Sequence, residues 1–325
     1  MKVLITGITG FVGSHLVDYI LANHSETAIH GLVRWRSPMD NLRHLPADKL
    51  NLIYGDLSDL GSLIRILKEI KPDVIFHLAA QSYVPTSFNA PVDTIQTNII
   101  GTTNLLEAVR ITAIEPVIHI CSSSEVYGQA REDEVPIKED CPLRPSSPYG
   151  VSKVGEDMIS FQYWLSYGIK TIRTRMFTHT GPRRGQVFVV SAFARQIALI
   201  EQKQQDPVMR VGNLESVRTF SDVRDAVMAY WLLVNKCQPG DVYNIGGNRT
   251  IEIREMLNML LGLSPIKDKI EIKVDPKLLR PSDVTLQIPD CSKFKKLTGW
   301  EPEIPFEKTL EDTLNYWRDY FKREG

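Results

Sequence analysis

The chain has 325 residues, a formal net charge of -1, 43% hydrophobic residues and 24% charged residues. This balance gives no electrostatic basis for binding nucleic acid or an anionic membrane, and no apolar run approaches the length needed to span a bilayer. The four cysteines are scattered without metal-ligand spacing, which is typical of free thiols in a reducing compartment. We therefore expect a cytoplasmic protein of one large or two modest domains, with no metal site and no nucleic-acid or membrane partner.

A glycine-rich turn stands between the first predicted strand and the first predicted helix. Val3-Leu4-Ile5 is apolar enough for a buried strand, three glycines spaced by threes follow, and apolar residues then recur at helical spacing from Leu16 to Leu21. The N–H groups that begin such a helix favour an anion, and the pattern favours the pyrophosphate of a dinucleotide. The alternative is a glycine turn that binds no ligand. The cofactor contacts expected in this turn are Gly7, Thr9, Gly10, Phe11, Val12 and Gly13.

The second predicted strand, Ala28–Val33, indicates which dinucleotide is bound. NAD sites place a carboxylate at the end of this strand, whereas NADP sites place arginine there for the 2′-phosphate. Here no carboxylate is present, and Arg34 and Arg36 follow at once. The motif favours NADP as the cofactor over the alternative of an ordinary solvated basic loop.

Strands and helices alternate along the next hundred residues. We expect strands at 50–54, 74–77 and 117–121, helices at 60–70 and 94–111, and a sixth strand at 169–175. This alternation predicts an α/β fold, a Rossmann-type doubly wound parallel sheet with its ligands at the carboxyl ends of the strands. Further cofactor contacts are expected at those ends, from Asp56, Leu57, Leu78, Ala79, Ala80 and Gln81.

The domain organisation follows from where this alternation stops. We expect a nucleotide-binding domain over residues 1–175, with a returning segment near 213–245, and a smaller C-terminal substrate-binding domain over 176–325.

Tyr149 and Lys153 are four residues apart at the start of a predicted helix, so both project from one helical face. A lysine cation and a positive nicotinamide ring favour the phenolate of a nearby tyrosine, which then serves as a base for an alcohol. Lys153 is also expected to hold the nicotinamide ribose. Ser123, at a strand end, is expected to hydrogen-bond the substrate oxygen. The alternative is an ordinary helix-surface pair.

These motifs together resemble the extended short-chain dehydrogenase/reductase family, which acts on nucleotide sugars. Within it, Pro182-Arg183-Arg184-Gly185, Val211-Gly212-Asn213-Leu214 and Arg280-Pro281-Ser282-Asp283-Val284 resemble GDP-mannose 4,6-dehydratases, while 193–232 is similar to the companion 4-keto-6-deoxymannose reductases. The resemblance implies NADP, a GDP-sugar substrate, a homodimer or homotetramer, and an arginine loop that reaches a neighbouring subunit's cofactor. The expected substrate contacts are Ser82, Ser124, Thr178, Val187, Asn213, Arg218 and Arg280. Many relatives have asparagine at the position of Thr178.

Glu125 bears on the choice among activities. In a 4,6-dehydratase, a carboxylate must remove the C5 proton once C4 is a ketone, and Glu125 follows Ser123 and Ser124 at the right place. The reductase branch also carries a glutamate there, and the double arginine favours the dehydratase. The sequence thus predicts a GDP-mannose 4,6-dehydratase with Ser123, Glu125, Tyr149 and Lys153 as catalytic residues. The alternatives are a reductase or epimerase of the same branch, and a catalytically silent dinucleotide sensor.

Overall fold

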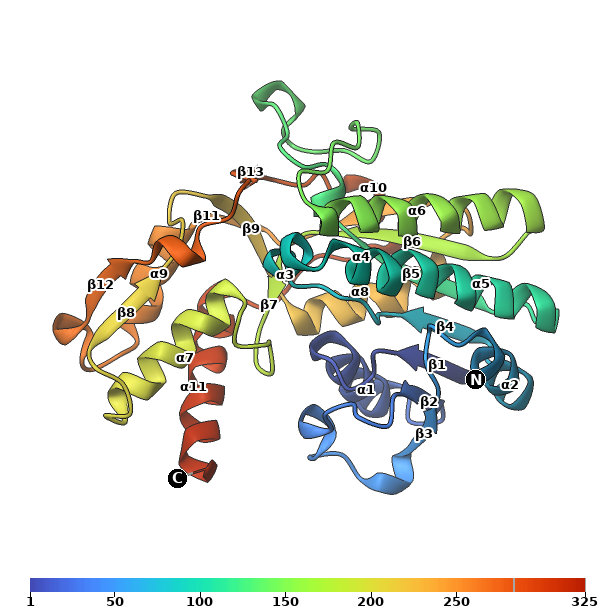
Figure 1. Cartoon of the computed structure of the whole chain (residues 1–325), viewed down its shortest axis with the longest axis horizontal. Helices are drawn as coiled ribbons and strands as arrows, with labels where there is room; N and C mark the ends of the chain where they lie inside the picture. Colours follow the sequence, from blue (N-terminus) through green and yellow to red (C-terminus); the bar gives the residue numbers. More distant parts are fainter. Residues whose placement is uncertain (283, 325) are drawn as a thin grey trace.

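A seven-stranded parallel sheet forms the right-hand half of the computed structural model, which describes residues 1–282 and 284–324 (Figure 1). Asp283, in the last of the quoted motifs, lies outside the described residues. The sheet has the order β10-β6-β5-β4-β1-β2-β3, and every neighbouring pair is parallel. Its strands are β1 (Lys2–Thr6), β2 (Ala28–Val33), β3 (Leu50–Tyr54), β4 (Val74–His77), β5 (Val117–Ser123), β6 (Thr171–Met176) and β10 (Val242–Ile245). The expected Rossmann-type sheet is confirmed.

The central strand β1 is buried on both faces, which is why it reads as an unbroken apolar run. Val3 and Ile5 pack in one hydrophobic cluster with α1 (Phe11–Asn23) and α8 (Val223–Lys236), whereas Leu4 packs in another with α2 (Leu60–Ile70) and α5 (Gly101–Thr112). Successive side chains of a strand point to opposite faces, so three consecutive apolar residues serve two helical layers. The sheet is therefore doubly wound, as expected.

The helix expected at 94–111 is divided into three parts. It comprises α4 (Pro91–Ile95), a π-helical turn (Gln96–Ile100) and α5. Turns of this kind inside helices are frequent at functional sites because they redirect a side chain. Here the turn contains Asn98, which is 1% exposed and lies beside the site described below.

Helix α6 (Pro148–Tyr167) carries the tyrosine–lysine pair, and local signals define both of its ends. The Ser147 hydroxyl accepts a hydrogen bond from the Gly150 N–H at 3.0 Å, and Pro148 occupies the first helical position. Gly168, with φ of 68°, ends the helix in the left-handed conformation. This helix packs against β5 and β6, which places its first turn at the carboxyl edge of the sheet.

The C-terminal part forms a second hydrophobic cluster around smaller sheets (left half of Figure 1). The strands are β7 (His179–Thr180), β8 (Val208–Val211), β9 (Val217–Asp222), β11 (Arg249–Glu252), β12 (Glu271–Val274) and β13 (Leu286–Gln287). The remaining helices are α3 (Val84–Asn89), α7 (Val189–Glu201), α9 (Ile253–Gly262), α10 (Ser292–Thr298) and α11 (Phe306–Glu324). No helix among the described residues combines the length and apolar character needed to cross a bilayer.

The chain returns to the first sheet at α8 and β10, while β9, inside the expected returning segment, pairs with β11 in the second sheet. A second return, not expected from the sequence, brings Phe294 of α10 and Trp300 into the cluster around α1 and α8. On this basis we propose a nucleotide-binding domain of residues 1–176 extended by 223–245 and 291–300.

Candidate active site

One cleft of about 1570 Å³ opens along the carboxyl ends of the parallel strands and extends to α7 and β8. It is lined by all but one of the residues expected to bind cofactor or substrate or to take part in catalysis. They are Gly7, Thr9, Gly10, Phe11, Val12, Gly13, Arg34, Arg36, Asp56, Leu57, Leu78, Ala79, Ala80, Ser82, Ser123, Ser124, Glu125, Tyr149, Lys153, Thr178, Val187, Asn213, Arg218 and Arg280.

The β1–α1 turn is shaped to admit a dinucleotide. Gly7 has φ of +72°, and a Cβ there would lie 2.9 Å from the backbone of Ala79. At Gly13, a Cβ would lie 2.3 Å from the Gly7 carbonyl oxygen, so only glycine lets the helix pack this close to its strand. The Gly10 residue that begins α1 offers no side-chain cap, which leaves the first N–H groups of the helix to an anion. The residues present therefore fit the pyrophosphate of a dinucleotide.

The strand end opposite this turn is fixed by Thr6. Its hydroxyl accepts hydrogen bonds from the N–H groups of Leu78 and Ala79, each at 3.2 Å. These bonds hold Leu78 and Ala79 against the glycine turn, where both residues line the cleft.

Arg34 and Arg36 lie at the rim of the cleft after β2, exposed to solvent. Neither guanidinium forms an ion pair within the described parts of the chain, whereas the nearby Arg43 pairs with Asp40. The two arginines are thus available for an anionic group at the end of β2.

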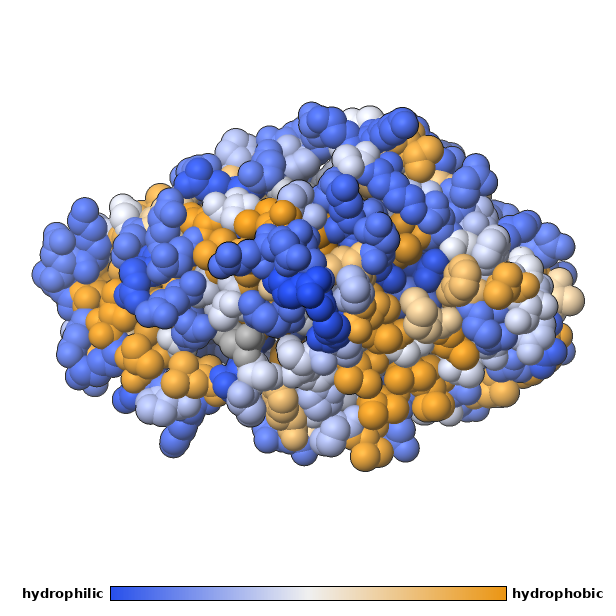
Figure 2. All heavy atoms as spheres, turned by 90° about the horizontal axis from the view of Figure 1, so that it is seen from above, coloured by the Kyte–Doolittle hydropathy of each residue, from blue (hydrophilic) through white to orange (hydrophobic). Residues whose placement is uncertain are grey.

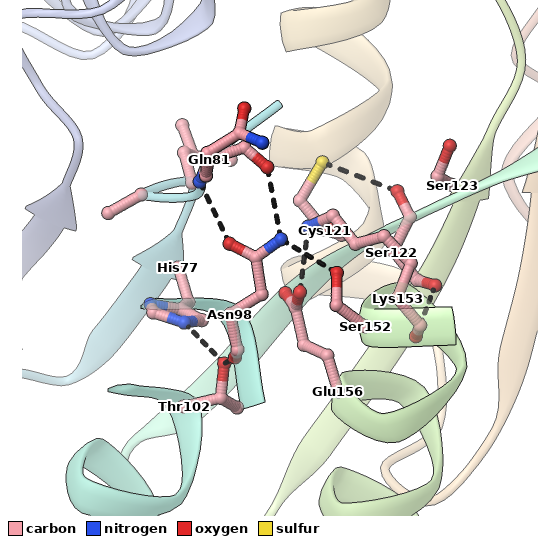
Figure 3. A network of polar contacts seen from close by, with 12 residues as sticks. His77, Gln81, Asn98, Thr102, Cys121, Ser122, Ser123, Ser152, Lys153 and Glu156 are labelled. Atoms are coloured by element: carbon pink, nitrogen blue, oxygen red, sulfur yellow. Dashed lines mark hydrogen bonds and ion pairs between the residues drawn. The ribbon is translucent and has the colours of Figure 1, made fainter. Parts of the chain in front are cut away.

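Gln81 is the exception among the expected cofactor contacts, because it does not line the cleft. Its side-chain amide donates to the Thr94 hydroxyl at 3.0 Å and accepts from the Tyr83 N–H at 2.7 Å. Its backbone N–H donates to the Asn98 amide oxygen at 2.8 Å, and the Asn98 amide in turn donates to the Ser152 hydroxyl at 2.8 Å (Figure 3). Gln81 therefore ties the loop after β4 to the π-helical turn and α6.

Tyr149 and Lys153 lie in the cleft as the helical spacing predicts. Both are almost fully buried, and the Lys153 Nζ is 6.0 Å from the centroid of the Tyr149 ring. The ammonium donates to the Cys121 carbonyl oxygen at 2.8 Å and to the Glu156 carboxylate at 2.7 Å (Figure 3). Two of its three N–H donors are thus committed to β5 and α6.

Lys153 alone does not produce the low tyrosine pKa that the sequence predicts. Burial raises the pKa of the Tyr149 phenol above that of free tyrosine, and the Lys153 cation and the Ser123 hydrogen bond oppose this only in part. Desolvation of the phenolate is the larger effect here. A phenolate at neutral pH therefore needs a further positive charge in the cleft.

Glu125 lies two residues after Ser123, in the middle of a 3-10 turn formed by Ser124–Val126. The Ser123 hydroxyl oxygen accepts from the Glu125 N–H at 3.2 Å. A Cβ on Gly150 would lie 2.8 Å from the Glu125 carbonyl oxygen, so this turn abuts the first turn of α6 next to Tyr149. The cleft is thus lined by the phenol of Tyr149, the hydroxyl of Ser123 and the carboxylate of Glu125, with the Lys153 ammonium 6.0 Å from the centroid of the phenol ring.

Arg184 lies in the cleft, although the sequence assigned it only to the arginine loop. Its guanidinium stacks 3.7 Å from the centroid of the Phe188 ring and 4.8 Å from that of Phe11, and burial lowers its pKa to about 10. Its neighbour Arg183 pairs with Asp18 and donates to His15 of the same chain. Other cleft residues without an expected role include His179, Arg195, Gln196 and Arg210. Arg184 belongs to the double-arginine motif, which is a signal in the sequence. No local sequence pattern indicates that the other four residues line the cleft.

Comparison with known proteins gives this cleft its context. Residues 4–313 match the family model described as GDP-mannose 4,6 dehydratase. The chain is 36% identical to a GDP-mannose 4,6-dehydratase of Yersinia enterocolitica over 96% of this chain and 92% of that protein. It is 32% identical to a GDP-6-deoxy-D-mannose reductase of Pseudomonas aeruginosa over 99% of each. The solved structure of RMD from Pseudomonas aeruginosa complexed with NADPH superimposes with a TM-score of 0.84, covering 98% of this chain and 99% of that one at 32% identity. The resemblance drawn from the sequence motifs is confirmed, and the chain belongs to the GDP-mannose 4,6-dehydratase family.

Proposed function

We propose that the protein is an NADP-dependent GDP-mannose 4,6-dehydratase, which converts GDP-mannose to GDP-4-keto-6-deoxymannose and water. The observation that carries this proposal over a reductase is the double arginine Arg183-Arg184, which lines the same cleft as the base Glu125 and the pair Tyr149 and Lys153. The family match and the dehydratase relatives support it. Arg34 and Arg36, and the NADPH found in the structurally similar RMD, support NADP.

The residues divide the reaction between them. Tyr149 accepts the proton of the C4 hydroxyl, and Ser123 donates a hydrogen bond to the same oxygen. NADP, held by the β1–α1 turn and by Arg34 and Arg36, would supply the hydride acceptor for oxidation at C4, the hydride for reduction at C6 and an additional positive charge. Glu125 removes the C5 proton, which the C4 ketone has made acidic, and delivers it to the C6 hydroxyl, which leaves as water. When the hydride is added at C6, C5 takes up a proton that comes from solvent. Because the hydride returns to the same sugar, the reaction needs no external reductant.

The deciding experiment omits reductant. Purified protein is given GDP-mannose in deuterated water without added NADPH. A dehydratase forms a 4-keto sugar that carries deuterium at C5, because that carbon is deprotonated and then reprotonated from solvent. A protein that leaves GDP-mannose unchanged under these conditions, with NADP supplied, is not a dehydratase.

The second candidate is a reductase acting on the 4-keto product. It is favoured by the match to the Pseudomonas aeruginosa reductase over 99% of both chains. The same Tyr149 would then donate a proton to O4. Oxidation of added NADPH by GDP-4-keto-6-deoxymannose, with no reaction of GDP-mannose, identifies this activity.

We further propose that the protein is a cytoplasmic homodimer or homotetramer. Exposed apolar side chains recur every seven residues along α6, at Val151, Met158 and Leu165, and Ile100 and Ile111 are exposed on the neighbouring helical segments. Figure 2 shows apolar side chains in both halves of this face, with the largest group right of the centre, and Figure 1 shows α5 and α6 in the right-hand half. A pair of helices from a second subunit would bury this row of exposed apolar side chains. Light scattering of the wild type and of Leu165→Lys tests this, and an unchanged mass for the variant contradicts it.

A further inference from the structure

Glu156 is a buried carboxylate that the reaction does not use. It lies on α6, three residues after Lys153, is 1% exposed, and points toward the Lys153 ammonium beneath the cleft (Figure 3). Its Oε2 accepts from the Lys153 Nζ at 2.7 Å, while Oε1 is buried with no hydrogen-bond partner among the described residues. A carboxylate held this way is costly to bury unless its charge serves another group.

The neighbouring carboxylate shows what a purely structural pair looks like on the same helix. Asp157 is also buried, but both of its oxygens are bound, to Arg173 at 2.8 Å and to Arg175 at 2.8 Å. That pair joins α6 to β6. In the described part of the chain, by contrast, the only hydrogen-bond or ion-pair partner of the Glu156 carboxylate is the lysine that serves Tyr149, so its effect is passed to the active site.

We infer that Glu156 is a positioning residue: it orients the Lys153 ammonium and offsets part of the positive charge that Lys153 presents to Tyr149. This inference concerns the acid–base pair common to the dehydratase and reductase alternatives. With one donor of Lys153 on Cys121 and one on Glu156, the third is left for the cleft. The negative charge of Glu156 also acts on the phenol, because it raises the pKa of Tyr149.

The other titratable groups around this pair are few. They are Tyr149 and Asp157 from α6, Cys121 and His119 from β5, His77 from β4, Tyr230 from α8, and Arg184 from the loop after β7. Burial lowers the pKa of His77 and of His119 to about 3, so both rings stay neutral near pH 7. Burial raises the pKa of the Cys121 thiol, which therefore stays protonated. Burial raises the pKa of the Glu156 carboxyl to about 7, and the Lys153 cation opposes that shift. Above this pH, Glu156 carries the negative charge that lies against the Lys153 ammonium.

The test is the ionisation of Tyr149, read without a sugar. Phenolate absorbance is followed against pH in the protein saturated with NADP, and the same titration of Tyr149→Phe is subtracted. Glu156→Gln keeps an oxygen acceptor for Lys153 but removes the charge, so the phenolate pKa should fall by about one unit. That shift corresponds to a roughly tenfold larger phenolate fraction on the acidic limb. NADP affinity should change little, because the lysine is still held.

Two further variants make the result decisive. Glu156→Met removes both charge and acceptor, and it should lower the phenolate pKa and also weaken NADP binding several-fold. Asp157→Asn is the matched control: it should lower the melting temperature and leave the phenolate pKa unchanged.

An unchanged or raised phenolate pKa in Glu156→Gln overturns the inference, as does an equal shift in Asp157→Asn. If Glu156→Gln and Glu156→Met both fail to fold while Asp157→Asn folds, Glu156 is structural and the inference is wrong. Failure of GDP-mannose turnover leaves this titration readable, so the two proposals are tested separately.

Discussion

The His15 ring lies between the Pro182 carbonyl and the Arg183 guanidinium. Its Nε2 donates to the carbonyl oxygen at 2.9 Å, and its Nδ1 accepts from the arginine at 2.6 Å, which requires a neutral ring. His15 is on α1 and Arg183 is on the loop after β7. The contact therefore joins the nucleotide-binding domain to the C-terminal part of the chain. Burial, followed by the charge of Arg183, lowers the pKa of His15 to about 4.

Loss of this contact should destabilise the fold. Arg183→Gln removes the ion pair with Asp18 and the bond to His15, and we expect a loss of about 1–3 kcal/mol in the free energy of unfolding. Denaturant unfolding measures it. Arg43→Gln is the control, since the Arg43–Asp40 pair is exposed and should contribute little. An equal loss of unfolding free energy in both variants would show that the Arg183 contact contributes no more than an exposed ion pair.

Acid should destabilise the protein through its buried histidines. The pKa of His15 is lowered to about 4 and those of His77, His119 and His179 to about 3, chiefly by burial. The unfolded chain binds protons near pH 6.5 while the folded chain does not. Stability that is present above pH 6.5 is therefore lost as the pH falls from 6.5 toward 4, at about 1.4 kcal/mol per pH unit for each ring.

Unfolding midpoints at pH 7.5, 6 and 5 measure this loss. His77→Asn should show a shallower dependence, because one of the four rings is gone. A stability that does not change between pH 7.5 and 5 contradicts the neutral state of these rings.

The sheet and the site could be predicted largely from local patterns. The run Val3–Ile5, the glycines of the first turn and the spacing of Tyr149 and Lys153 are short-range features, and each lies where its periodicity predicts. The hydrophobic and steric demands behind them act within one strand or one helical turn.

The contacts that sequence reasoning missed are those between distant segments. His15 and Arg183 are separated by 168 positions, and no local periodicity links a helix to a loop so far along the chain. Gln81 follows a strand end as cofactor contacts do, yet its side chain turns to Thr94 of α4, while Asn98 of the π-helical turn pairs with its backbone. The expected lowering of the Tyr149 pKa took account of Lys153 and the nicotinamide ring, but not of the burial that opposes it.

Arg34 should distinguish the two dinucleotides. Arg34→Ala is expected to weaken NADP binding and to leave NAD binding almost unchanged, because only NADP carries the 2′-phosphate. Dissociation constants for both cofactors, measured by calorimetry, test this. Arg43→Ala, on a nearby arginine outside the cleft, should alter neither. Equal losses for NADP and NAD in Arg34→Ala contradict the assignment.

Substitution of Tyr149 should reduce turnover alone, whereas substitution of Lys153 should reduce both turnover and NADP affinity. Tyr149→Phe removes only the phenolic proton acceptor, so NADP binding should survive while turnover is lost. Lys153→Met removes a cation that we expect to hold the nicotinamide ribose, so turnover should fall and NADP affinity with it. Steady-state rates and cofactor titrations of both variants check this. Near-normal turnover by Tyr149→Phe places the base elsewhere.

Glu125 separates elimination from simple hydride transfer. Glu125→Gln keeps the shape of the side chain and its place beside Ser123, but an amide cannot accept the C5 proton. General base catalysis contributes roughly a hundredfold to ten-thousandfold, so turnover of GDP-mannose should fall by about that factor. Oxidation at C4 should survive, since Tyr149 and Ser123 are untouched, and the variant should accumulate enzyme-bound NADPH with a 4-keto hexose. Rapid-quench analysis with absorbance of the reduced nicotinamide follows both species. A variant that reacts at the wild-type rate, with no deuterium at C5 of the product, rules out elimination at this residue and favours the reductase.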